Sequence, residues 1–288
     1  MSRKIIIDCD NTFSVSGCDI DDGLAIIYAL AQEDTEILGI CTTFGNNELD
    51  IVFPNTVRFM KDIGCENIPV YRGTTDSCAD NEAAKFLVDM ANTYEGELSL
   101  IGLGSLTNLY HAWQLDHTFY NKINAISLMG GITEPLIINN TSLRELNFSI
   151  HYQAALHVLQ HANKLIIATG NTCLDGFFTR GRFDKLKEGS KFEGWLYEQA
   201  IYWFEGVEKV FHSKGIYLWD ILAVAALLNP ELFQNNWVDI SPDKVSIKNG
   251  MLIGHGNTRS VVIPKIRNVD NYIEHIYLSF NKFGEIYK

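Results

Sequence analysis

A short segment near the amino terminus contains the side chains best suited to chemistry. Five aspartates fall within fifteen residues: Asp8, Asp10, Asp19, Asp21 and Asp22. Capping of a following helix accounts for one or two of them, because a carboxylate at a helix start accepts hydrogen bonds from free N–H groups. The remaining carboxylates would repel one another unless a positive charge lay between them.

A divalent cation is the simplest charge that would hold these aspartates together. Carboxylate oxygens suit a hard ion such as Ca²⁺ or Mg²⁺, and neither a histidine nor a cysteine pair lies close by to favour zinc. The pattern therefore predicts a metal site. The alternative is an unusually acidic turn between a strand and a helix, with no metal.

The sequence around the aspartates predicts the elements that position them. Residues 5–7 are three isoleucines, a β-branched run typical of a strand buried on both faces, and this strand places Asp8 and Asp10 at its carboxyl end. The apolar run 23–30 has helical spacing and directly follows Asp22. A strand, a loop and a helix therefore bring the acids to one edge of a sheet.

Further strands are expected at 36–42 and in the segments that precede two glycine-containing turns, at 103–105 and 129–131. Open parallel sheets bind ligands at the carboxyl ends of their strands. Asn46 follows one of these ends and is a candidate for binding, although an asparagine in a turn needs no function.

A long loop contains polar residues where a site is expected. The loop 132–147 contains Asn139, Asn140, Glu145 and Asn147 with little regular pattern, and such loops usually line a site, although a solvated connection is the alternative.

Trp219 and Asp220 directly precede an apolar helix. Asp220 alone could be only a helix cap.

Composition limits the class of protein. A chain of 288 residues with 47% apolar residues can fill a large core, and residues 1–288 are expected to form one α/β domain. The expected fold is a mainly parallel, Rossmann-like open sheet with helices on both faces and a small antiparallel β addition near the carboxyl terminus.

The net charge and the lengths of the apolar runs argue against several kinds of partner and location. A net charge of −12 argues against nucleic acid and anionic membranes as partners. No run is long enough for a membrane helix and no signal peptide is seen, so a cytoplasmic protein is expected. The six scattered cysteines, Cys78 among them, are expected to be reduced.

Six stretches together resemble one enzyme family. They are the aspartates 8, 10, 21 and 22, then TTFGNN, IPVYRG, LGSLTNL, LMGG followed by ELNFSIHYQAA, and WDILAVAALLNPELF. In the same order they are similar to D-x-D-P-G-x-D-D, T-x-x-G-N, I-P-V-x-x-G, L-G-P-L-T-N, M-G-G with E-F-N-x-x-x-D-P-E-A-A, and H-D-P-x-A-V-A-x-x-x-P of the nucleoside hydrolases, which are calcium-dependent ribohydrolases. Six matches in one order are far more specific than a single motif.

The resemblance implies a hydrolase that cleaves the N-glycosidic bond of ribonucleosides to free base and ribose. It implies Ca²⁺ held by Asp10, Asp22, Asp220 and the backbone carbonyl of Leu103, with Asp10 also the general base toward a calcium-bound water. Homodimers or homotetramers are the implied assemblies. The residues implied to contact substrate are Asp21, Asn46, Met129, Asn139, Glu145, Asn147 and Trp219.

The chain departs from the family pattern in three places. The residues between the two acid pairs are about seven longer, so Asp19 competes for one of the acidic roles. The short segment 74–83 has no counterpart of the family's H-G-x-x-G loop. Trp219 replaces the histidine that protonates the leaving base, and because purine-preferring members stack a tryptophan there, purine nucleosides are favoured. A core role for Trp219 is the alternative, with His212 and Tyr217 as other candidates for an acid or a pocket wall.

Two rival functions follow from the same residues. The IIIDCDNTF stretch also matches the start of haloacid-dehalogenase-like phosphatases, in which Asp8 would be the nucleophile and Asp10 the acid and base. That reading leaves the later motifs without roles. The other rival is a nucleoside-binding relative that has lost turnover through its loop changes.

Overall fold

The computed structural model of the chain describes residues 2–75 and 80–286, so Cys78 lies outside the described residues. The strands are β1 (Arg3–Cys9), β2 (Thr35–Thr42), β3 (Val70–Arg72), β4 (Leu98–Gly102), β5 (Ala125–Met129), β6 (Ile137–Ile138), β7 (Thr141–Ser142), β8 (Leu165–Ala168), β9 (Phe177–Thr179), β10 (Gly215–Tyr217), β11 (Phe233–Gln234), β12 (Trp237–Ile240), β13 (Arg259–Val262) and β14 (Lys265–Ile266).

The α-helices are α1 (Asp21–Leu30), α2 (Leu49–Asp62), α3 (Glu82–Thr93), α4 (Thr107–Leu115), α5 (Phe119–Lys122), α6 (Tyr152–His161), α7 (Gly170–Cys173), α8 (Arg180–Phe183), α9 (Lys191–Phe211), α10 (Trp219–Leu228) and α11 (Val269–Ile286). The short 3₁₀ helices are η1 (Asp184–Glu188), η2 (Pro230–Leu232) and η3 (Ile247–Asn249). Strand and helix thus alternate through most of the described chain, as the sequence predicts.

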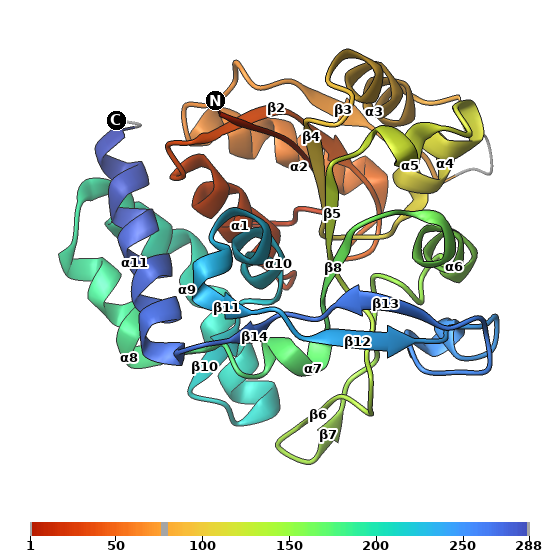
Figure 1. Cartoon of the computed structure of the whole chain (residues 1–288). Helices are drawn as coiled ribbons and strands as arrows, with labels where there is room; N and C mark the ends of the chain where they lie inside the picture. Colours follow the sequence, from red (N-terminus) through yellow and green to blue (C-terminus); the bar gives the residue numbers. More distant parts are fainter. Residues whose placement is uncertain (1, 76–79, 287–288) are drawn as a thin grey trace.

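One sheet organises the molecule (Figure 1). Among the described residues it has eight strands in the order β12-β13-β8-β5-β4-β1-β2-β3. All neighbouring pairs are parallel except β12 with β13, which are antiparallel. The prediction of a mainly parallel open sheet with a small antiparallel addition near the carboxyl terminus is confirmed.

Strand β1 is buried on both faces because its neighbours supply apolar cover on each side. Ile5 and Ile7 belong to one core and Ile6 to the other, which is the period of two expected of a strand. Helices α1, α9, α10 and α11 contribute to the first core, and α3, α4 and α6 to the second. In Figure 1 these two groups lie on opposite sides of the sheet.

Two buried helices bring distant acids to the same place. Helix α1 is buried along nearly its whole length, and α10 is apolar around its circumference. The two helices pack against each other, and the Ser127 hydroxyl of β5 donates to the Ala223 carbonyl of α10 at 2.7 Å. Because both helices begin with acidic residues, their packing sets Asp21, Asp22 and Asp220 beside one another.

The extra residues 11–20 form an ordered loop that is tied to two helices. The Asn55 amide of α2 donates to the carbonyl oxygens of Asn11 (3.0 Å) and Phe13 (3.2 Å). The Tyr202 hydroxyl of α9 lies 3.1 Å from the carbonyl oxygens of Val15 and Cys18. The insertion is therefore held in place, and it delivers Asp19 to the strand ends.

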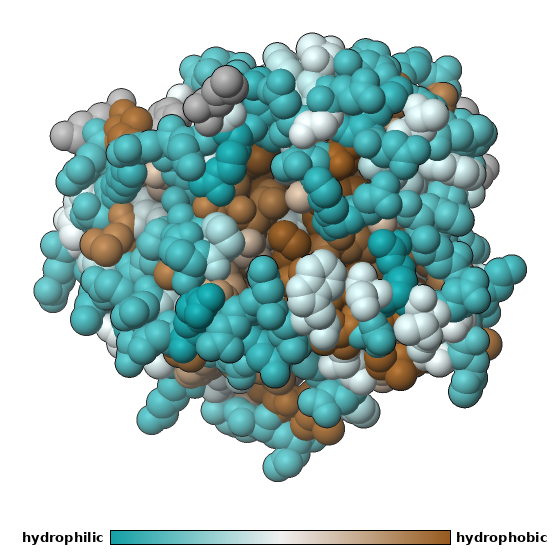
Figure 2. Space-filling view, in the orientation of Figure 1, coloured by the Kyte–Doolittle hydropathy of each residue, from teal (hydrophilic) through white to brown (hydrophobic). Residues whose placement is uncertain are grey.

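Hydrophilic residues cover most of the face seen in Figure 2, and hydrophobic residues group near its centre. Within the described ranges, no helix combines the length and apolar character that crossing a bilayer requires. Cys9, Cys18, Cys41, Cys65 and Cys173 are free thiols. The loop 132–147, expected to be irregular, contains the small β6–β7 hairpin.

Candidate active site

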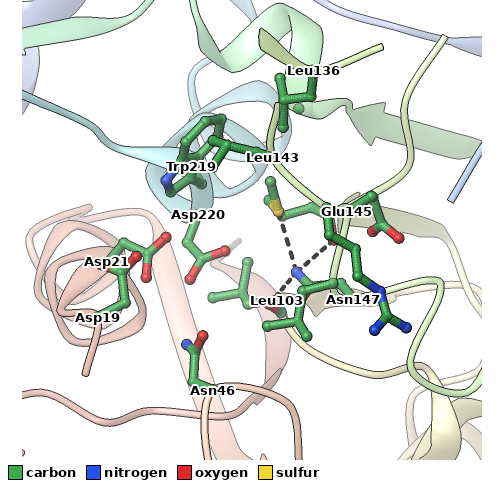
Figure 3. A pocket seen from close by; sticks show the side chains of 14 residues that line it. Asp19, Asp21, Asn46, Leu103, Leu136, Leu143, Glu145, Asn147, Trp219 and Asp220 are labelled. Carbon is green, nitrogen blue, oxygen red and sulfur yellow. Dashed lines mark hydrogen bonds between the residues drawn. The ribbon is translucent and has the colours of Figure 1, made fainter. Parts of the chain in front are cut away.

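A cavity of about 200 Å³ opens at the carboxyl ends of the parallel strands (Figure 3). Asp19, Asp21 and Asp220 lie on one side of it, and Glu145 and Asn147 on the other. The lining residues are Asp19, Asp21, Asn46, Leu103, Met129, Leu136, Leu143, Arg144, Glu145, Leu146, Asn147, Gly170, Trp219 and Asp220. Most of the residues implied by the resemblance are thus brought together.

Three aspartates form a group suited to a divalent cation. Asp21, Asp22 and Asp220 each offer a carboxylate oxygen, and these oxygens lie within 4.8 Å of one another. All three side chains are buried. Asp22 accepts hydrogen bonds from the backbone N–H of Asp10 (3.1 Å) and the amide of Asn46 (3.0 Å). Among the described residues, no hydrogen-bond donor reaches the Asp220 carboxylate, and an unpaired buried carboxylate of this kind fits a metal ligand.

Asp10 lies beside this group but is turned toward Asn46. Its Oδ2 accepts from the Asn46 backbone N–H at 2.5 Å, and its Oδ1 lies 3.4 Å from the Asn46 amide nitrogen. Two glycines leave room for this carboxylate. A Cβ on Gly45 would lie 2.1 Å from Oδ2, and one on Gly104 would lie 3.0 Å from Oδ1. The longer loop therefore does not separate Asp10 from Asp22, since the Asp10 backbone N–H donates to the Asp22 carboxylate.

Burial and mutual repulsion shift the acidities of these groups in the same direction. Burial raises the pKa of Asp10 to about 6 and that of Asp19 to about 6. Burial, together with the neighbouring aspartates, holds the pKa values of Asp21, Asp22 and Asp220 well above their usual range. A bound cation would reverse this shift, because it favours the ionised carboxylates.

The wall opposite the acids is built around Asn147. Its amide donates to the carbonyl oxygens of Leu103 (2.8 Å) and Met129 (3.1 Å), and its nitrogen lies 3.2 Å from the Met129 sulfur. The Leu103 carbonyl, implied as a metal ligand, is thus fixed in direction at the end of β4. A carbonyl oxygen has two lone pairs, so this hydrogen bond leaves one for a cation.

Glu145 and Asn139, both predicted to contact substrate, form hydrogen bonds within the protein. The Glu145 carboxylate lines the cavity, but it accepts from the backbone N–H groups of Gly131 (3.0 Å), Phe148 (2.8 Å) and Ser149 (2.9 Å). It thus holds the loop together. Asn139 lies at the exposed turn of the β6–β7 hairpin, outside the residues that line the cavity, and its amide donates to the Phe211 carbonyl at 2.9 Å.

Trp219 forms a wall between two cavities. It lines the first one and also a second cavity of about 210 Å³, which lies toward α9 and β10. The indole ring centroid is 5.3 Å from that of Tyr217. Trp219 is only partly buried, and it lines both cavities. Tyr217 lines the second cavity, whereas His212 is exposed and lines neither.

Several lining residues were not identified from the sequence. Leu136 and Leu143 come from the loop that carries Glu145, and Arg144 lies directly beside that glutamate. Their only sequence signal is membership of the polar loop 132–147. Single apolar residues in a polar loop do not by themselves indicate a site, because the fold of the hairpin decides where their side chains point.

Asp8 lies away from both cavities, although it is also buried. Its carboxylate accepts from the Asn108 amide at 2.8 Å, and burial raises the pKa of Asp8 to about 8. It lines neither cavity. The phosphatase reading requires a nucleophilic Asp8, but this carboxylate is buried and lines neither cavity.

A mainly parallel α/β sheet with a cavity lined by carboxylates at its strand ends is the arrangement of a small-molecule enzyme. The family described as "Inosine-uridine preferring nucleoside hydrolase" matches residues 5–273. The chain belongs to this family, and it is an N-ribohydrolase, an enzyme that acts on N-glycosyl compounds. The resemblance found in the sequence is confirmed.

Individual relatives agree with the family match. A "Probable uridine nucleosidase 2" of Arabidopsis thaliana is 26% identical over 262 residues, which cover 80% of this chain and 79% of the relative. The structure of a plant nucleoside hydrolase matches with a TM-score of 0.83 at 21% identity, covering 98% of this chain and 99% of that one. A purine-preferring ribonucleoside hydrolase from Gardnerella vaginalis matches with a TM-score of 0.81 at 22% identity, covering 98% and 99%. Both structures share the fold.

Proposed function

We propose that the enzyme hydrolyses ribonucleosides to free base and ribose with Ca²⁺ in its site. The observation that carries this proposal is the convergence of Asp21, Asp22 and Asp220 within 4.8 Å at the mouth of a cavity. Carboxylates alone, with a backbone carbonyl nearby, form a donor set for a hard divalent cation rather than for zinc.

Asp10, Asp22, Asp220 and the Leu103 carbonyl are the proposed ligands of the cation. Ca²⁺, when bound, would acidify a coordinated water and orient the ribose hydroxyls. Asp10 is the proposed general base, which takes a proton at a carboxylate oxygen from the water that attacks C1′. Its hydrogen bonds with Asn46 fix that carboxylate in direction.

The sugar is proposed to lie between the acids and Asn147. Asp21 and Asn46 offer polar atoms on one side, and Asn147 and Met129 form the other. These groups match a ribose, whose ring gains positive charge as the glycosidic bond breaks. Glu145 is proposed to act by holding the Asn147 loop in position, because its carboxylate is engaged by backbone groups.

Purine nucleosides are the first candidate substrates. The position of Trp219 in the cavity lining supports this, because an indole stacks on a flat two-ring base and such stacking contributes about 1 kcal/mol. Uridine is the second candidate, supported by the name of the Arabidopsis relative.

Release of free base tests the proposal. Inosine, guanosine, adenosine, uridine and cytidine would be incubated with the enzyme, and base and ribose quantified with Ca²⁺ and with a chelator. We expect release from at least one nucleoside, lost with the chelator and restored by Ca²⁺. Saturable binding without release would instead support the non-catalytic relative, and phosphate release from nucleotides the phosphatase.

We also propose a cytoplasmic homodimer or homotetramer, as the family resemblance implies. Light scattering coupled to size-exclusion chromatography measures the mass directly. A mass of 32.5 kDa, that of one chain, would refute the assembly.

A further inference from the structure

The second cavity is an aromatic enclosure with one acid in its wall. Its volume is about 210 Å³, and its walls include Trp203, Phe211, Tyr217 and Trp219. Asp19 lines this cavity and also the first one. Because the two cavities share Asp19, Leu143 and Trp219, a riboside with its sugar in the first cavity directs its base toward the second.

The chemistry of this enclosure favours a positive charge. Among the described residues that line it, none is a lysine, arginine or histidine. Aromatic faces attract a cation within about 6 Å through the ring quadrupole, and a carboxylate at the same wall adds a direct Coulombic attraction. A neutral base gains only stacking from the same walls.

The charged residues of the first cavity also favour a positively charged base. Of the acids that line the first cavity, Asp19, Asp21, Glu145 and Asp220, only Asp19 also lines the second. Arg144 is the one basic residue among the described lining, and it is exposed. Arg144 directly precedes Glu145 in the chain and does not line the second cavity. The wall that the two cavities share therefore contains an acid and, among the described lining residues, no basic side chain.

The leaving base also has few proton donors. A neutral base must gain a proton as the C1′–N bond breaks. No histidine or lysine occurs among the described residues that line the two cavities. The Tyr217 phenol is a weak acid here, because burial raises the pKa of Tyr217. A base that already carries a positive charge needs no proton, since the electron pair of the C1′–N bond neutralises it.

We propose that the enzyme acts preferentially on ribosides with a cationic base, namely N-ribosyl pyridinium compounds and N7-alkylated purine ribosides, held by Asp19 and the aromatic enclosure. This rests on the proposed ribonucleoside hydrolysis. The C1′–N bond breaks and its electrons pass to the ring nitrogen, giving a neutral base. Water forms the new C1′–O bond and loses a proton to Asp10. Each turnover thus releases ribose, the neutral base and one proton to solvent.

Matched substrates test the inference on the wild-type enzyme. 7-Methylguanosine and guanosine differ by one methyl group and one charge, and 3-carbamoylpyridinium riboside is the second cationic probe. We expect KM for 7-methylguanosine to be about tenfold below that for guanosine. As inhibitors, 1-methyl-3-carbamoylpyridinium should act at about tenfold lower concentration than neutral 3-carbamoylpyridine. Equal KM values and equal inhibition would overturn the inference.

Variants assign the effect to the enclosure. Asp19→Asn should reduce the KM advantage of 7-methylguanosine over guanosine at least fivefold, and Trp203→Leu should reduce it as well. Asp175→Asn, which removes an exposed acid outside both cavities, should leave the ratio unchanged. Thermal unfolding checks that each variant folds. Guanosine cleavage with an unchanged ratio in Asp19→Asn would overturn this inference alone, whereas no release from any riboside would overturn the proposed function too.

Discussion

Replacing Asp220 by asparagine should stabilise the metal-free enzyme while removing its response to calcium. The Asp220 carboxylate lies within 4.8 Å of oxygens from Asp21 and Asp22. Two ionised carboxylates at that distance repel by about 3 kcal/mol at an effective dielectric constant of about 20. The asparagine removes this repulsion and loses at most about 1 kcal/mol of helix-dipole interaction at the start of α10.

The gain depends on pH because the pKa values of the group are raised. With raised values the folded state holds protons that the unfolded state releases, so the metal-free protein loses stability as pH rises from the unfolded value of about 4 through the raised values. The stabilisation by Asp220→Asn should therefore be larger at pH 8 than at pH 5.5. In a chain of this size, 3 kcal/mol corresponds to about 6 °C in Tm.

Thermal unfolding with a chelator and with Ca²⁺ provides the assay. Ca²⁺ at about 100 times its Kd should add about 2.7 kcal/mol to the wild type and nothing to Asp220→Asn. Asp175→Asn is the control, because it removes an exposed charge outside the group. If Asp220→Asn melts below the wild type in chelator at pH 8 and keeps its calcium response, the metal group is refuted.

Three other variants test separate parts of the site, and a fourth tests the stability of the fold. Asp10→Asn should lower kcat by several orders of magnitude with little loss of stability, and a loss below tenfold would contradict its role as base. Gly45→Ala places a methyl group 2.1 Å from Asp10 Oδ2, so kcat should fall about 100-fold, whereas Gly194→Ala, with open space around it, should have no effect. Trp219→Ala should harm inosine more than uridine, and equal losses would indicate a structural role. Burial lowers the pKa of His157 to about 4, so stability falls as pH drops from about 6.5 to 4, and chemical unfolding of His157→Gln should show a shallower loss.

The sequence was most informative where chemistry and local structure coincide. The three isoleucines and the acids that follow them identify β1 and its carboxyl end, because β-branched residues and period-two burial are local properties. The helical spacing of the apolar residues after Asp22 likewise predicted α1 and its acidic start. The repeated pattern of an apolar strand followed by a glycine-containing turn predicted the parallel sheet.

The sequence did not predict the contacts of side chains whose direction depends on distant partners. Glu145 was expected to bind sugar, yet backbone N–H groups from three residues surround its carboxylate. Asn139 was expected beside it, but the β6–β7 hairpin carries it to the surface and toward Phe211. Neither outcome has a sequence signal, because both depend on how one loop folds back on itself.

By itself, the sequence determined the family and the fold class and predicted the residues that we propose bind a cation, because motif order, periodicity and residue chemistry are properties of the chain. Only the tertiary structure showed that the Asp220 carboxylate, nearly two hundred residues after Asp22, lies within 4.8 Å of those of Asp21 and Asp22, and that Trp219 lines two cavities. The physical reason is that these placements come from the packing of α1 on α10 and of α9 on β10. Such contacts join residues far apart in the chain, and local preferences carry no information about them.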